Sequence, residues 1–516
     1  MRTFHYDGEP VIETSSGLIK GYALGDIHIF KGIPYARAER FQMPVPVHWE
    51  GVRQCASYGY VCHLLEESEP HGELRCPHMY WPQDENCLNL NIWTPSLTEG
   101  AGKPVMVWLH GGGYAAGSSI EQLAYDGLRL AENGDLVVVS INHRLNIFGY
   151  LDASVLGEGY ENSGNAGTAD LVAALRWVQQ NIRKFGGDPR NVTIFGQSGG
   201  GMKVTDLMNI PAADGLYAKA FAMSGVANEG ISSIIKENQP GRGGDELVRA
   251  MAKDLGCTEL RELTSVPAKA LIASYLKVRP EYEKEYFAGT PYPNDWYRGW
   301  PSTKGFRKEV KDIPLLIGTV FGEFGTPAAI DREKPLSREH LGKELQKLCG
   351  KNSEAIKEEF RKLYPEKDVY DVLYYARVFR CPTLTPARKL TKIGGKAYVY
   401  LFAHNYDYQQ HIPAWHCSDI PLVFGNAEII DYCQNEEAYA LQEKVFAAVT
   451  SFARHGDPNN ALLPQWPAAS PQEVPTMIID NEWRLLAKSD EKLIALLDEV
   501  SERMNLSLFA SNDVQH

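Results

Sequence analysis

The chain has 516 residues, of which 44% are hydrophobic and 23% charged, a composition typical of a large globular protein with an extensive core. The net charge is −13 and no basic cluster is present, which argues against nucleic acid as a partner. The first residues lack the apolar run of a signal peptide, and no apolar stretch has the length of a membrane span. We therefore expect a cytoplasmic protein without a membrane partner, and its nine cysteines are expected to be reduced.

The first half of the chain alternates predicted strands with a predicted helix. Residues 11–35 alternate apolar and polar side chains around glycines, as small antiparallel hairpins do. Short apolar runs predict strands at 89–93, 104–109, 136–141, 192–195 and 218–224. Residues 168–184 carry apolar side chains at helical spacing, which predicts an amphipathic helix. This alternation predicts an α/β fold with a large, mostly parallel central sheet and helices on both faces.

The second half of the chain has a looser pattern. Helices are expected at 244–256, 266–277, 337–362, 436–454 and 489–504, and buried strands at 313–320 and 397–403. No repeat, low-complexity segment or linker interrupts the chain, so residues 1–516 are expected to form a single domain. Insertions at about 226–310 and 326–395 are expected to form its gorge or cap side. The aromatic stretch 292–300 either lines such a gorge or belongs to the core.

A glycine-rich pentad follows the predicted strand 192–195. It reads Gly196-Gln197-Ser198-Gly199-Gly200, the G-x-S-x-G pattern of a nucleophile elbow. In such an elbow a sharp turn from strand to helix exposes the serine hydroxyl, and the flanking glycines leave room for the turn. The pentad alone also fits an ordinary glycine-rich loop, so the prediction that Ser198 is a nucleophile depends on its partners.

A catalytic serine needs a histidine as base and a carboxylate that orients the histidine, each after a later strand of the sheet. Glu323 lies just past the strand 313–320, between glycines, and is the predicted acid. The strand 397–403 is followed by His404, His411 and His416. His416 lies in a longer loop, from which a side chain reaches across the sheet edge more readily. Residue reasoning therefore favours His416 over His411 without deciding between them.

A serine hydrolase also needs backbone N–H groups that stabilise the oxyanion. Gly111, Gly112 and Gly113 follow the strand 104–109 and His110, and bare glycine backbone there permits close approach to a substrate. The N–H group of Gly199, directly after the predicted nucleophile, completes such an oxyanion hole. A merely flexible turn is the alternative for this loop.

The sequence resembles the type-B carboxylesterases of the cholinesterase/carboxylesterase family over nearly its whole length. Residues 185–200 resemble the serine signature of that family, and residues 85–92 resemble its second signature, with Asn86 where the family usually has aspartate. The family's residue types are also matched in three further segments, at residues 30–36, 164–167 and 452–459. The resemblance implies an α/β-hydrolase fold and hydrolysis of small-molecule carboxylic esters through an acyl-enzyme intermediate.

The resemblance also implies roles for individual residues. It implies Ser198 as nucleophile, Glu323 as acid and His416 as base, since the family's histidine precedes a short helix that ends in Phe-Gly, here residues 424–425. It implies oxyanion donors and a serine that supports the acid, at these positions: Gly112, Gly113, Gly199 and Ser224. No Cys/His cluster has zinc-like spacing, so neither a metal ion nor another cofactor is expected.

Two further positions depart from the family pattern. Gln197 stands where the family often has glutamate, and Gly199 stands where alanine is common. The family members of secretory compartments pair a cysteine like Cys87 with one upstream, here Cys62 or Cys76. A binding or adhesion protein on the same fold is the competing class, but such relatives have typically lost the nucleophile. A third alternative keeps the same catalysis but changes the substrate, as in a lipase, an amidase or a specialised polyester hydrolase.

Overall fold

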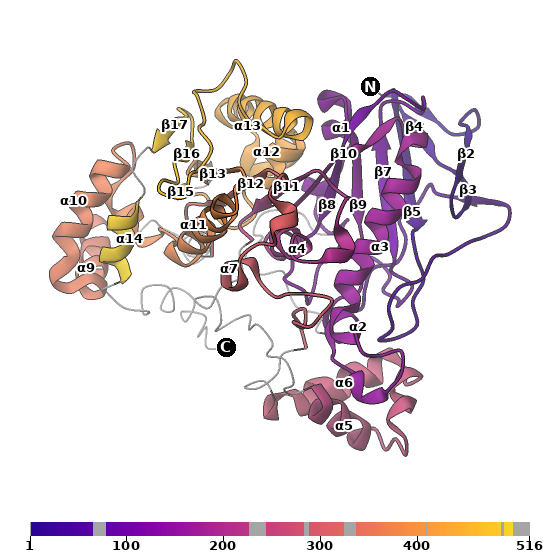
Figure 1. The fold of residues 1–516 in the computed structure, drawn as a ribbon. Helices are drawn as coiled ribbons and strands as arrows, with labels where there is room; N and C mark the ends of the chain where they lie inside the picture. Colours follow the sequence, from indigo (N-terminus) through magenta and orange to yellow (C-terminus); the bar gives the residue numbers. More distant parts are fainter. Residues whose placement is uncertain are drawn as a thin grey trace.

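The computed structural model describes residues 2–65, 79–225, 244–282, 288–324, 337–408, 410–486 and 490–498. A twelve-stranded sheet runs through the molecule (Figure 1). Its strands, in order across the sheet, are β1 (Phe4–His5), β4 (Tyr22–Leu24), β5 (Ile27–Pro34), β7 (Asn89–Thr94), β9 (Val137–Ile141), β8 (Lys103–Leu109), β10 (Gly187–Gln197), β11 (Lys219–Met223), β12 (Leu315–Val320), β13 (Ala397–Phe402), β16 (Thr476–Ile479) and β17 (Arg484–Leu486).

The strands from β9 to β16 all pair in parallel, and antiparallel strands extend the sheet at both edges. Parallel strands need long crossover connections, which explains why helices separate them in the chain. A smaller sheet of β2 (Val11–Thr14), β3 (Gly17–Lys20) and β6 (Val52–Gln54) lies near the N-terminus. The predicted fold class, a large and mostly parallel sheet, is confirmed.

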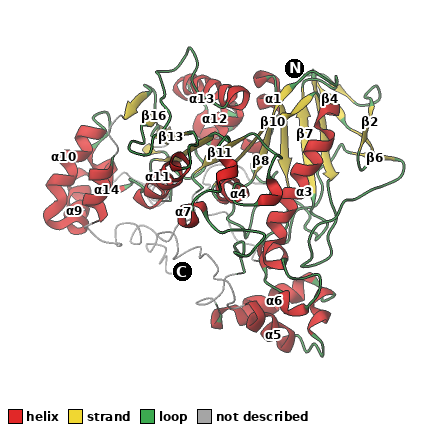
Figure 2. Cartoon of the chain, viewed as in Figure 1, coloured by secondary structure: helices red, strands yellow, loops and turns green. Residues whose placement is uncertain are grey.

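Helices cover both faces of the sheet (Figure 2). Along β8, the side chains of Val105 and Val107 join one core cluster, and those of Met106 and Trp108 join another. The first core is covered by α3 (Ala166–Asn181), α4 (Gly199–Leu207) and α11 (Arg377–Lys392). The second is covered by α1 (Leu128–Gly134), α12 (Ile420–Phe424) and α13 (Glu436–His455). Both faces are therefore buried, so the central strands are predominantly apolar.

Two groups of helices lie away from the sheet. One group contains α5 (Gly244–Asp254) and α6 (Ala268–Val278), at the bottom of Figure 1 near α2 (Asn146–Tyr150). The other contains α9 (Arg338–Cys349), α10 (Ser353–Leu363) and α14 (Glu491–Asp498), at the left of the same view. The first group and most of the second fall in the segments expected to be insertions. Parts of those segments, 226–243, 283–287 and 325–336, lie outside the described residues.

Two helical segments differ from the sequence-based expectation. Residues 337–362 form two helices, because Gly350 adopts a left-handed φ of 49° after α9. The helix α11 was not predicted, since Pro382 and Pro386 lie inside it and proline usually ends a helix. Packing against β12 and β13 stabilises α11 in spite of these prolines.

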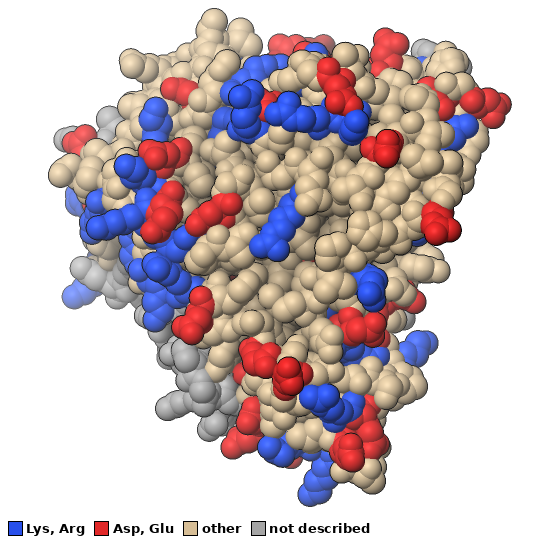
Figure 3. Space-filling model, turned by 45° about the vertical axis from the view of Figure 1, so that its right-hand side comes forward, with Lys and Arg blue, Asp and Glu red and all other residues tan. Residues whose placement is uncertain are grey.

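The surface carries charges of both signs. On the face shown in Figure 3, basic and acidic side chains are interspersed, and the whole chain has a net charge of −13. Among the described helices, none is both long and apolar enough to cross a membrane.

Candidate active site

The predicted nucleophile lies at the turn between β10 and α4, in the middle of the sheet. Ser198 has a φ of 58° and a ψ of −126°, values that a residue other than glycine rarely adopts. It is half-buried, whereas Gln197 and Gly199 on either side are buried. A Cβ atom on Gly196 would lie 2.5 Å from the carbonyl oxygen of Leu109, so the turn requires glycine there. The strained turn therefore presents the serine hydroxyl and no neighbouring side chain.

The predicted acid and the predicted base lie side by side, although 93 positions separate them in the chain. Glu323 is the third residue after the end of β12 and has a left-handed φ of 41°. The Gly322 N–H group donates to the Ala414 carbonyl at 2.8 Å, and the His416 N–H group donates to the Glu323 carbonyl at 3.1 Å. His416 Nδ1 donates to one carboxylate oxygen of Glu323, and the other oxygen accepts a 3.0 Å bond from the Val320 N–H group.

Side chains from the loop after β12, from α11 and from the end of β10 contact the imidazole ring of His416. The ring is buried, and its centroid lies 4.1 Å from that of Phe324 and 5.7 Å from that of Phe379. The side-chain Nε2 atom of Gln197 lies 3.3 Å from His416 Nε2, and the side-chain Oε1 atom of Gln197 accepts a 3.2 Å bond from the Cys417 thiol. Since Gln197 directly precedes Ser198, these contacts place the imidazole beside the elbow. The carboxylate on Nδ1 selects the tautomer whose Nε2 is the basic nitrogen.

Of the other two candidate histidines, His404 contacts a different carboxylate. His404 is buried and its Nδ1 lies 3.5 Å from a carboxylate oxygen of Asp480. His411 lies on β15 (Gln410–Pro413), which pairs with β14 (Asn405–Tyr408) in a hairpin, and its side chain lies outside the described part of the chain.

The glycine loop after β8 packs against the elbow. A Cβ atom on Gly111 would lie 3.4 Å from the Ser198 Cβ atom. A Cβ atom on Gly199 would collide with the backbone nitrogen, Cα and oxygen of Gly113. Gly112 and Gly113 have φ values of 84° and 63°, a conformation that favours glycine. The backbones of the predicted oxyanion donors therefore lie together, next to Ser198.

Ser224 directly follows β11 with a φ of 45°, and its N–H group donates to the Gly318 carbonyl at 2.7 Å. Its hydroxyl group is buried and makes no hydrogen bond with any residue that the structure describes. Its support of the acid therefore stays a prediction.

The sequence analysis did not single out Asp419, although it lies three residues after His416. Asp419 is buried, and burial, together with the negative charge of Glu323, raises its carboxyl pKa to about 7. The Tyr400 hydroxyl donates to it at 3.4 Å. Asp419 is thus a second buried acid near the Glu323–His416 pair. In the sequence, only its short spacing from His416 could have identified it.

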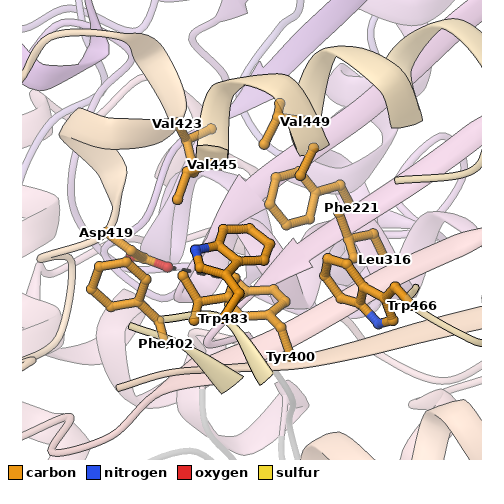
Figure 4. Close-up of a pocket in the computed structure, with 12 residues that line it drawn as sticks. Phe221, Leu316, Tyr400, Phe402, Asp419, Val423, Val445, Val449, Trp466 and Trp483 are labelled. Atoms are coloured by element: carbon orange, nitrogen blue, oxygen red, sulfur yellow. Dashed lines mark hydrogen bonds between the residues drawn. The ribbon is translucent and has the colours of Figure 1, made fainter. Parts of the chain in front are cut away.

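A cavity of about 20 Å³ lies between the sheet and the helices α12 and α13 (Figure 4). Asp419 is the one acidic group on a lining that is otherwise aliphatic and aromatic, with Phe221, Leu316, Val445 and Trp466 among its members. A space of this size holds on the order of one water molecule. It cannot take an acyl group, so it is not a substrate site. Across the described ranges, no three His, Cys, Asp or Glu side chains converge to hold a metal ion.

The structure brings Cys62 and Cys87 together as two buried free thiols. A hydrogen bond with Cys62 and burial raise the pKa of the Cys87 thiol well above its usual value. Cys76, the alternative neighbour, lies outside the described residues.

A strand, a strained serine turn and a helix succeed one another on a broad parallel sheet, an arrangement that defines the α/β-hydrolase fold. Residues 8–494 match the sequence model of the carboxylesterase family. The chain therefore belongs to the carboxylesterase family, and it is a serine hydrolase that cleaves carboxylic esters through an acyl-enzyme intermediate. It is an enzyme and not a binding or adhesion protein.

Individual relatives are similar over almost the whole chain. Para-nitrobenzyl esterase of Bacillus subtilis (strain 168) is 32% identical over 502 residues, which cover 92% of this chain and 95% of that protein. The structure of an esterase from anaerobic Clostridium hathewayi is 46% identical, with a TM-score of 0.92, and the match covers 97% of this chain and 100% of that one. A carboxylesterase structure from Geobacillus stearothermophilus is 30% identical, with a TM-score of 0.72 and coverages of 94% and 99%.

Proposed function

We propose that Ser198, His416 and Glu323 form the catalytic triad of this esterase. Ser198 Oγ attacks the carbonyl carbon of the ester, while His416 Nε2 takes its proton and passes it to the departing alcohol. Water, activated by the same imidazole, then hydrolyses the acyl-enzyme. Glu323 holds the imidazole in the required tautomer and stabilises its protonated form. The observation that carries this proposal is the buried Glu323–His416 hydrogen bond beside the strained elbow.

The N–H groups of Gly112, Gly113 and Gly199 are the proposed donors to the oxyanion of the tetrahedral intermediate. The close packing of Gly113 on Gly199 supports this assignment, since donors must converge on one oxygen atom. Ser224 is proposed to support the acid from the neighbouring loop.

The proposed substrates are esters that join aliphatic and aromatic groups. The Clostridium hathewayi esterase, which is 46% identical to this chain, can hydrolyze aliphatic aromatic polyesters. Its similarity over the full length supports the same substrate class here.

We also propose a single domain over residues 1–516, with the segments at about 226–310 and 326–395 on the gorge or cap side, and a cytoplasmic location.

The proposed role of Ser198 as nucleophile is tested by labelling with a fluorophosphonate and by measuring turnover of a short-chain p-nitrophenyl ester. We expect the label on the peptide that contains Ser198, and Ser198→Ala is expected to lose both labelling and turnover while its melting temperature stays unchanged. Ser57→Ala, at an exposed serine, is the matched control and should keep both. Turnover by Ser198→Ala, or a label on another serine, would remove Ser198 from the mechanism.

The substrate class is tested with a suspension of an aliphatic–aromatic polyester. Release of the aromatic diacid, measured by chromatography and absent with Ser198→Ala, is the expected result. An enzyme that turns over the p-nitrophenyl ester but releases no diacid would contradict the substrate proposal alone.

A further inference from the structure

A buried lysine packs behind the glycine loop of the site. Lys203 lies in the second turn of α4, the helix that begins directly after Ser198, and its side chain has no exposed surface. Within the described residues, its Nζ atom donates one hydrogen bond, of 3.1 Å, to the carbonyl oxygen of His110. Lysine is almost never fully buried, because an ammonium group loses its hydration there. The free energy lost when the Lys203 ammonium group is buried must therefore be offset by an interaction that it makes at this point.

Lys203 contacts both ends of the loop that carries the proposed oxyanion donors. His110 is the first residue of that loop, and Tyr114 is the residue that follows its glycines. The Lys203 Nζ atom lies 5.7 Å from the centroid of the Tyr114 ring, within the range of a cation–π contact. One turn further along α4, Asp206 accepts a hydrogen bond from the Tyr114 hydroxyl. The helix that carries the nucleophile at its start thus also holds the loop.

The charged neighbours of Lys203 come from several elements. Glu121, in the loop after the glycines, and Asp206, on α4 itself, both favour the ammonium form, while burial lowers the lysine pKa to about 7. His110 and His143 face it from the ends of β8 and β9, and burial together with the Lys203 charge holds the pKa of both imidazoles well below its usual value. Both imidazoles are therefore neutral and add no positive charge here.

We propose that Lys203 is a positioning residue for ester hydrolysis, which holds the loop 110–114 against the elbow and places a positive charge behind the oxyanion donors. This inference rests on the proposed roles of Gly112, Gly113 and Gly199. Negative charge develops on the carbonyl oxygen only as the tetrahedral intermediate forms. The positive charge that Lys203 carries below about pH 7, in a water-poor place, therefore favours that state over the bound ester. An interaction of this kind changes kcat more than KM.

The test compares Lys203→Met, which keeps the apolar length, with Lys203→Gln, which keeps a hydrogen-bond donor without the charge. For Lys203→Met we expect kcat on a p-nitrophenyl ester to fall about 10- to 100-fold, with KM changed less than about twofold. Affinity for a trifluoromethyl ketone, which adds to the serine as a tetrahedral oxyanion, should fall by the same factor. Lys203→Gln should lose less than Lys203→Met, and it replaces that variant if Lys203→Met does not fold.

Lys219→Met is the matched control. Lys219 is also a buried lysine, and burial lowers its pKa to about 8. It is the first residue of β11, at the opposite end of that strand from Ser224, and it is hydrogen-bonded to Asn191. We expect this variant to keep the wild-type kcat and ketone affinity.

Wild-type kcat and ketone affinity in a folded Lys203 variant would overturn the inference, as would losses that Lys219→Met shares. A fall in kcat without a matching fall in ketone affinity would overturn it as well. These failures are distinguishable from a failure of the proposed triad, which shows as turnover by Ser198→Ala.

Discussion

Substitution of Gly199 by alanine tests the packing between the elbow and the glycine loop. The added Cβ atom would lie well inside the 3.0 Å that real Cβ atoms keep from the backbone nitrogen, Cα and oxygen of Gly113. The clash is with backbone, so a flexible side-chain tip cannot relieve it, and the loop must move by roughly 1 Å. A misplacement of that size costs about 10²-fold in rate, and loss of one oxyanion donor costs about 10²- to 10³-fold.

We therefore expect Gly199→Ala to lower kcat by about 10²- to 10³-fold with little change in KM, although the family commonly has alanine at this position. The assay is steady-state hydrolysis of a p-nitrophenyl ester, normalised by titration of reactive serine. Gly8→Ala is the control, since a Cβ atom on the exposed Gly8 meets nothing within 4 Å. A kcat within about twofold of the wild-type value would refute the reasoning, because the loop would then accept the methyl group without displacing its donors.

Three further predictions concern buried charges. Glu323→Gln should lower kcat by about 10³- to 10⁴-fold, because the amide no longer selects the required tautomer of His416, and a wild-type rate would contradict this role. Arg380→Met should lower the free energy of unfolding in denaturant by about 3–5 kcal/mol, because Asp490, 2.9 Å from Arg380 Nε, is left as an unpaired buried charge; an unchanged unfolding midpoint would contradict it. Since the pKa of Lys203 is about 7 in the folded state and near 10.5 when unfolded, the unfolded chain binds more protons between these values. The free energy of unfolding should therefore rise with pH across this window, and Lys203→Met should flatten that rise when unfolding is measured at several pH values.

The strands and most helices were predictable because their signals are local. A run such as 136–141 is apolar except for Ser140, since both faces of its strand are buried. The helix α11 lacked such a signal, because Pro382 and Pro386 indicate a break. Its stability comes from contacts remote in sequence, including the buried pair of Arg380 with Asp490 on the C-terminal side of the chain.

The site shows the same division between local and distant information. The pentad around Ser198 and the glycines before Tyr114 could be identified in the sequence, because glycines at adjacent positions permit the backbone geometry that these turns need. The longer loop around His416 favoured it over His411 but did not decide between them. The backbone bonds from 322–323 to 414–416 bring one imidazole to Glu323, and those bonds exist only in the folded sheet.

The sequence by itself determined the chemical groups and the strand ends that carry them, because local periodicity and glycine placement depend on adjacent residues alone. Only the tertiary structure decided which imidazole meets the carboxylate, how tightly Gly113 packs on Gly199, and that Lys203 lies behind the loop. Such distances join residues far apart in the chain, and they follow from how helices and strands pack together, which no local pattern encodes.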